Sequence, residues 1–134
     1  MKGTRPHNTA PATGEFIPAK APDHLNKYAA DVWQATITDL ETGGRKIPQE
    51  YTQAFLGFCH CSGTVRECDE VLAREGMVVD GGREGPKRHP LIVVKNSALL
   101  GLRGYAESLG LTPASAGRLP KPEPANVPNE FDNL

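Results

Sequence analysis

Prolines are concentrated at the two ends of this chain, and they confine any packed core to the residues between them. Residues 1–21 contain three prolines and residues 119–134 contain four, among mostly small and polar residues. Such segments bury too little apolar surface to offset the entropic cost of ordering a backbone, which is about 1–2 kcal/mol per residue. We therefore expect two disordered tails, 1–21 and 119–134, on either side of one folded domain, 22–118.

The folded domain is small, and its composition favours self-association. Only 38% of the chain is hydrophobic, and a core of this size is marginal by itself. The net charge of −1 neither favours nor excludes nucleic acid. The first tail is basic, with Lys2, Arg5 and Lys20 against Glu15, whereas the last tail is acidic. This layout suits two kinds of partner, and simple solvation of the tails is an equal alternative.

The chain carries no membrane or export signal that its sequence would reveal. No segment approaches the ~18 consecutive apolar residues of a membrane-spanning helix, and none has the apolar centre of a signal peptide. Three cysteines, an odd number, indicate reduced thiols in a cytosol. We therefore expect no membrane partner.

Two helices are predicted in the first half of the domain by apolar residues at helical spacing. The first follows Asp23, a favourable N-cap, and ends at the glycines 43–44. The second begins at Pro48 and ends at Gly76, and a bend is expected near Gly63. Because the loop between them is short, the two helices should form an antiparallel hairpin.

The second half of the domain changes from helical to β character and back. Residues 77–79 are β-prone, and residues 80–82 have a composition typical of a turn. Residues 83–88 then supply the returning strand, which predicts a small β-hairpin. A third helix is expected from His89 to Gly110. Its predicted buried stripe consists of Leu91, Ala98, Leu99, Leu102, Tyr105, Ala106 and Leu109.

These elements predict a mainly α fold, made of an antiparallel helical hairpin, a small β-hairpin and a third long helix. Gly101 and Gly104 inside the third helix each cost about 1 kcal/mol relative to alanine. We therefore expect a neighbouring helix or a neighbouring subunit to approach closely there. After the helix, Thr112 and Pro113 should start a short terminal turn.

The cysteines and histidines favour structural roles over chemistry. Cys59 and Cys61 would point about 200° apart on a helix, and Cys61 and Cys68 would lie about 10 Å apart, so they lack zinc-site spacing. His89 directly precedes a proline at a helix start, where its side chain can meet the first turn. No serine elbow, phosphate-loop lysine motif or paired carboxylate site accompanies it. We expect no catalytic residue, no metal and no cofactor.

Basic residues spread along the chain could together form a phosphate-facing surface, particularly if many copies stand in a ring. The candidate DNA contacts are Lys2, Arg5, Lys20, Arg45, Lys46, Arg83, Lys87, Arg88, Arg103 and Arg118. A dispersed set of this kind is more often an ordinary solvated surface, so both interpretations stay open on these residues alone.

The order of these features resembles the small subunit of bacteriophage terminases, in the short form found in many long-tailed phages. The resemblance covers roughly residues 22–118, and its most specific part is the ending of the third helix. It is carried by a helix with a central Trp33, a helix opened by Ile47-Pro48, a Gly-rich hairpin, His89-Pro90-Leu91 and the ending Leu109-Gly110-Leu111-Thr112-Pro113-Ala114-Ser115. The family often has arginine directly after this serine, whereas here Ala116 and Gly117 precede Arg118.

The resemblance implies a non-enzymatic, virus-encoded protein of the host cytoplasm. It implies a homo-oligomeric ring that recognises packaging sites on viral double-stranded DNA and delivers the DNA to the large terminase subunit, which holds the ATPase and nuclease. The expected subunit contacts are Tyr28, Trp33, Tyr51, Phe55, Phe58, Gly101 and Gly104. The place of Trp33 on an apolar stripe also suits a core residue.

Two other functions compete with this one. In the first, the chain is a small DNA-binding regulator whose second and third helices form a helix-turn-helix, although the segment 77–88 exceeds the short turn of that motif. In the second, it is a structural phage adaptor that does not contact DNA.

Overall fold

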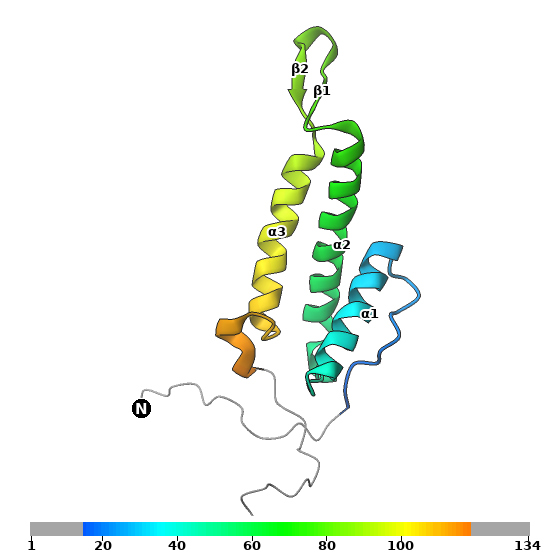
Figure 1. The fold of residues 1–134 in the computed structure, drawn as a ribbon, viewed down its shortest axis with the longest axis vertical. Coiled ribbons are helices and arrows are strands. Elements are labelled where there is room, and N and C mark those ends of the chain that lie inside the picture. The colour runs from blue at the N-terminus through cyan, green and yellow to red at the C-terminus, as the bar shows by residue number, and fades with distance from the viewer. Residues whose placement is uncertain (1–14, 119–134) are drawn as a thin grey trace, which may run out of the picture.

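The computed structural model describes residues 15–118, and most of both expected tails therefore lies outside the described residues. The predicted mainly α fold with one small antiparallel hairpin is confirmed (Figure 1). No helix in the described range is long and apolar enough to cross a membrane. In chain order the elements are α1 (Lys27–Thr42), the 3-10 turn η1 (Gln49–Tyr51), α2 (Thr52–Glu75), β1 (Val78–Asp80), η2 (Gly82–Glu84), β2 (Pro86–Arg88), α3 (Leu91–Ser108) and η3 (Pro113–Arg118).

The N-terminus of α1 is capped by Asn26, and the predicted cap Asp23 is wrong. The side-chain oxygen of Asn26 accepts a hydrogen bond from the Ala29 amide at 2.9 Å. A cap must stand directly before the first helical turn to reach these amides. Asp23 comes too early, because a turn closed by the Leu25 amide on the Pro22 carbonyl precedes the helix.

α2 is a single helix that continues through Gly63 and ends at Gly76, as predicted. Gly76 has φ +83°, a conformation that favours glycine. At Gly63 the missing side chain makes room for the first turn of α1, because a Cβ there would lie 2.8 Å from the backbone nitrogen of Ala29. The glycine that predicted a bend therefore permits close helix packing.

Contacts run in opposite directions along α2 and α3, so these two helices are antiparallel. Near the start of α2, Gly57 lies beneath the ring of Tyr105, close to the end of α3. Further along α2, Asp69 forms a salt bridge with Lys95, close to the start of α3. The β1–β2 hairpin connects the two helices at the far end (Figure 1).

α1 and α3 lie on opposite sides of α2, so the three helices form a row (Figure 1). Phe55 packs against Trp33 of α1, with 4.6 Å between the ring centroids, whereas Gly57 faces α3. Residues two apart on a helix point about 200° from each other. Further along α2, Cys61 again faces α3 and Gly63 again faces α1.

The hydrophobic core lies where α1 and α2 meet, and α3 contributes little to it. The buried cluster consists of Ile17, Ala29, Val32, Trp33, Ile37, Leu40, Ile47, Phe55, Cys59 and Leu109. Within α3 itself only Ala98 is buried. Leu99 and Tyr105 belonged to the predicted buried stripe, and both are exposed. At the edge of the row, α3 has a neighbouring helix on one side only among the described residues (Figure 1).

Residues 15–21, assigned to the disordered arm from the sequence, pack onto the helices. The Ile17 amide donates a hydrogen bond to the Ile47 carbonyl at 2.8 Å, and the Ile17 side chain is buried. The indole N–H of Trp33 donates to the Pro18 carbonyl at 3.0 Å. These contacts correct the expected arm boundary, because the buried Ile17 side chain and the hydrogen bonds to Ile47 and Trp33 anchor the segment.

Candidate nucleic-acid interface

The β1–β2 hairpin projects from the end of the α2–α3 pair, away from the end that holds η3 (Figure 1). Its strands are antiparallel, with Val78 opposite Arg88 and Val79 opposite Lys87. The turn is fixed locally, because Asp80 Oδ1 accepts a hydrogen bond at 2.8 Å from the amide two residues later. The short turn η2 then forms the tip.

The hairpin brings together three of the candidate DNA contacts. Arg83 lies in η2, and Lys87 and Arg88 lie in β2. All three side chains are exposed. Two carboxylates in the same hairpin leave three cations against two anions, a net charge of +1.

Exposed apolar side chains accompany these cations. Met77 and Val78 are both largely exposed, and Val78 lies directly opposite Arg88 across the strands. A two-stranded ribbon fits the major groove of B-DNA, and cations on it can pair with phosphates. The hairpin thus presents exposed cations beside exposed apolar side chains.

His89 joins the hairpin to both neighbouring helices. Its amide donates to the Met77 carbonyl at 2.8 Å, which closes the hairpin. Its Nδ1 accepts a hydrogen bond from the Leu91 amide at 3.0 Å, so the expected contact with the first turn of the helix is confirmed. Its Nε2 lies 3.7 Å from Glu75 Oε2 near the end of α2. The hairpin is therefore held at a defined place relative to α2 and α3.

Arg45, another candidate DNA contact, is engaged within the fold. Its Nη2 donates hydrogen bonds to the Gly110 carbonyl at 2.9 Å and to the Ala116 carbonyl at 3.0 Å. These bonds tie the loop between α1 and α2 to the segment after α3. Arg45 is also partly buried. It is therefore a fold-stabilising residue in this structure, unlike the exposed cations of the hairpin.

The structure does not bring the remaining candidate cations to the hairpin. Lys46 lies before η1, and the 24 residues of α2 separate that end from the hairpin by about 36 Å. Lys20 is exposed in the segment before α1, and Arg103 is exposed on α3. Arg118 ends η3. Lys2 and Arg5 lie outside the described residues.

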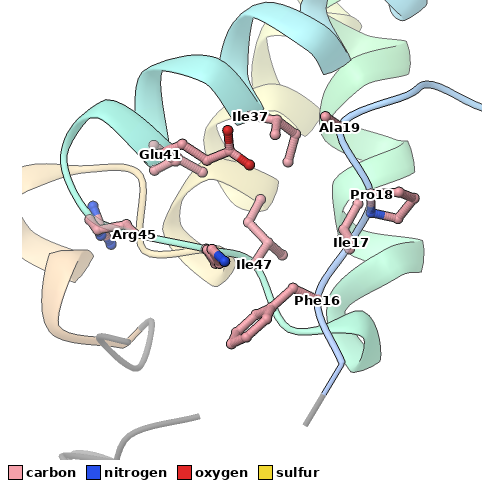
Figure 2. Close-up of a pocket in the computed structure, with 10 residues that line it drawn as sticks. Phe16, Ile17, Pro18, Ala19, Ile37, Glu41, Arg45 and Ile47 are labelled. Carbon is pink, nitrogen blue, oxygen red and sulfur yellow. The ribbon is translucent and has the colours of Figure 1, made fainter. Parts of the chain in front are cut away.

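A pocket of about 150 Å³ opens between the segment before α1 and the loop after it (Figure 2). Its lining consists of Phe16, Ile17, Pro18, Ala19, Ile37, Leu40, Glu41, Arg45, Lys46 and Ile47. Lys46 Nζ lies 5.4 Å from the centroid of the Phe16 ring, a cation–π contact. Because Glu41 stands beside two cations, the pocket offers no single charge that would select a phosphate.

Two of the expected subunit contacts are inaccessible to a second copy. Trp33 and Phe55 are buried against each other inside the protomer. Tyr51 and Phe58 are partly buried and pack on the same core. Tyr28 is partly exposed, and its hydroxyl donates a hydrogen bond to Glu70. The large aromatic residues thus serve mainly the contact between α1 and α2.

The two glycines of α3 have different surroundings. A Cβ at Gly101 would lie 2.9 Å from the Cys61 sulfur, so this glycine permits the approach of α2. Gly104 has nothing within 4 Å of its Cβ position. Val93 and Leu100 were not among the expected subunit contacts, and both are exposed on the same face of α3 as Gly104. Their spacing of seven residues was the available signal.

The three cysteines are free thiols within the helical packing. Burial raises the pKa of Cys59 to about 12, and burial also raises the pKa of Cys61 and of Cys68. Among residues 15–118, no group of three His, Cys, Asp or Glu side chains could hold a metal ion.

Comparison with known protein families gives a match over most of the domain. A family model described as phage terminase, small subunit, matches residues 29–126, which include every element from α2 to η3 and nearly all of α1. The match covers most of the chain. No curated protein and no solved structure matches significantly.

Proposed function

The chain belongs to the phage terminase small-subunit family, and on this premise we propose that it recognises packaging sites on viral double-stranded DNA and presents them to the large terminase subunit. Membership of the family supports a role in phage DNA packaging. The proposal adds that the protein works as a homo-oligomeric ring in the host cytoplasm. ATP hydrolysis and DNA cleavage are assigned to the large subunit, so the chain needs no catalytic residue, metal or cofactor.

The observation that carries the DNA contact is the projecting hairpin with Arg83, Lys87 and Arg88. Exposed cations that reach phosphates release condensed counterions, which supplies much of the affinity for DNA. The hairpin is also thin enough to enter a groove, where bases are distinguished.

A ring would strengthen this contact. One hairpin carries a net charge of only +1, which is a weak attraction for DNA by itself. Several copies arranged around an axis add their fields and their phosphate contacts, and affinity grows with the number of hairpins engaged. Oligomerisation and DNA binding are therefore linked in this proposal.

The alternative helix-turn-helix regulator fits the structure less well. The helices of that motif meet at about 90–120° and are joined by a turn of three to four residues. Here α2 and α3 run antiparallel with a complete β-hairpin between them. The other alternative, an adaptor without DNA contact, is an outcome of the following test.

The test compares duplex-DNA binding of the wild-type chain with that of the triple variant R83A/K87A/R88A over a series of salt concentrations. Fluorescence anisotropy of labelled DNA gives the affinity at each salt. We expect the triple variant to bind more weakly. We also expect its slope of log affinity against log salt to fall by about one for each lost phosphate contact.

A matched control removes three exposed cations from the helices, in the variant K27A/R66A/R74A. This control changes the net charge equally and should bind DNA almost as the wild type does. Equal losses in both variants would show a general charge effect and would rule out the hairpin as the contact. A wild-type chain without DNA affinity even at low salt would favour the adaptor.

A further inference from the structure

The outer face of α3 is apolar and is left exposed by the residues that the structure describes. Val93, Ser97, Leu100 and Gly104 follow one another at spacings of four and three residues, so they form one stripe along the helix. Val93 is 52% and Leu100 is 74% exposed. Gly104 has no side chain, so it leaves a shallow depression in this stripe, and nothing in the same protomer lies near its Cβ position. An exposed stripe of this kind marks an interaction surface.

The outer face of α1 carries small side chains and an acid. Asp31, Ala35, Thr38 and Thr42 have the same spacing of four, three and four residues, and all are exposed. The Thr38 hydroxyl donates to the Gln34 carbonyl at 2.8 Å, and the Thr42 hydroxyl donates to the Thr38 carbonyl at 2.9 Å. Because these hydroxyls are satisfied within the helix, the threonine methyl groups can be covered at little cost.

A cation on α3 and an anion on α1 lie at the same height along α2. Arg103 lies midway between Gly101 and Tyr105, which contact Cys61 and Gly57 of α2. Arg103 therefore lies at the height of Cys59, the residue midway between Cys61 and Gly57 on α2.

Asp31 has the same level on the other side of the row. It lies midway between Ala29 and Trp33, which contact Gly63 and Phe55 of α2. The residue midway between those two is again Cys59. Arg103 is 80% exposed, and its salt bridge within the described part of the chain is an i,i+4 pair with Glu107 at 3.6 Å, which contributes little stability.

We propose that the outer face of α3 in one copy docks onto the outer face of α1 in a second copy, with Arg103 paired to Asp31. The two faces lie on opposite sides of the row, so the contact is head-to-tail. Each copy then keeps one free α1 face and one free α3 face, and repetition closes a ring or continues as a filament.

The occupant of the α3 face is a second copy because the same chain presents the complementary surface. Leu100 and Val93 supply a ridge, and the small side chains Ala35 and Thr38 supply a shallow surface for it. Opposite charges stand at equal height, so copies related by rotation about an axis parallel to α2 can pair them without sliding. This inference rests on the homo-oligomer of the proposed function and names its interface.

The test is a charge swap measured by sedimentation velocity and native mass spectrometry of the full chain. The single variants Arg103→Glu and Asp31→Arg each place like charges in the interface, and we expect at least about tenfold weaker self-association. The double variant D31R/R103E restores an opposite pair, and we expect it to recover most of the wild-type assembly. Leu100→Ser should weaken assembly without recovery by either charge change.

Charge reversals elsewhere on the row serve as controls. Glu67→Arg and Arg74→Glu alter exposed residues of α2 that belong to neither outer face, and they should assemble as the wild type does. If the wild type assembles and both single swaps do too, or the double swap fails to recover, the α1–α3 contact is refuted and the oligomer itself stands. If the wild type is a monomer at every concentration, this contact and the proposed ring fail together, while DNA binding by the hairpin is judged separately.

Discussion

Gly63 of α2 lies against the backbone of Ala29 in α1, so closely that a Cβ at position 63 would stand 2.8 Å from the Ala29 nitrogen. The approach occurs in the first turn of α1, where Asn26 caps the helix through the amide of the same Ala29. A backbone in this position cannot give way as a flexible side chain would. The contact between α1 and α2 therefore depends on glycine at position 63.

Gly63→Ala should destabilise the protein even though alanine is the better helix former. Helix propensity favours alanine by about 1 kcal/mol, but overpacking against a backbone costs about 1–3 kcal/mol. We expect a net loss in urea unfolding. Gly104→Ala, measured at a protein concentration too low for self-association, is the matched control, because nothing in the same protomer lies near its Cβ position, and it should raise stability. A gain at both positions would contradict the close approach of α1 to α2.

Arg45→Ala should lower stability by about 1–2 kcal/mol, because two carbonyls after α3 lose a charge-assisted hydrogen bond. Its effect on DNA binding should be small. The salt dependence of DNA affinity, measured beside urea unfolding, separates the two roles. If the slope of log DNA affinity against log salt fell while the free energy of unfolding stayed the same, Arg45 would be a DNA contact after all.

Two substitutions at His89 should separate its two side-chain contacts. Asparagine places an acceptor near the position of Nδ1, so His89→Asn should keep the Leu91 amide protected from hydrogen exchange. Glutamine places a donor near the position of Nε2, so His89→Gln should keep the Glu75 contact and lose about 1 kcal/mol of protection at Leu91. Equal exchange of the Leu91 amide in both variants would show that the imidazole does not cap α3.

Stability should fall in alkaline solution because of Cys59. Burial raises the pKa of this thiol from 9.0 to about 12, so the folded state keeps a proton that the unfolded state releases. Between about pH 9 and pH 12 the unfolded state therefore gains, and the free energy of unfolding decreases as pH rises. The difference in stability between the wild type and Cys59→Ala should shrink from pH 8 to pH 10. A constant difference would show that Cys59 is not shielded from solvent.

The local elements could be predicted because their signals act over a few residues. Gly76 ends α2 at a positive φ that favours glycine, and the turn after Asp80 closes the β-hairpin, as the sequence indicates. The cap of α1 was misplaced by three residues, since Asp23 and Asn26 are both favourable caps. Only the direction of the preceding turn decides between them. The anchoring of residues 15–21 was also missed, because one buried Ile17 is a weak sequence signal.

The candidate interface shows the same division. The cations Arg83, Lys87 and Arg88 lie close together in the sequence, and the hairpin keeps them together in space. Arg45 has no such neighbour in sequence, and its bond to Gly110 joins residues 65 positions apart. Sequence reasoning therefore counted Arg45 among the surface cations.

The sequence by itself determined which segments form the helices and the hairpin, because apolar spacing, glycines and prolines constrain the backbone locally. Only the tertiary structure decided that the helices form a row, with Phe55 and Gly57 directed to opposite neighbours. The apolar stripes of a bundle and of a row look alike in sequence, since either one buries part of each helix. The row leaves Leu100 and Val93 exposed. This face of α3 is the surface on which we propose that a second copy docks.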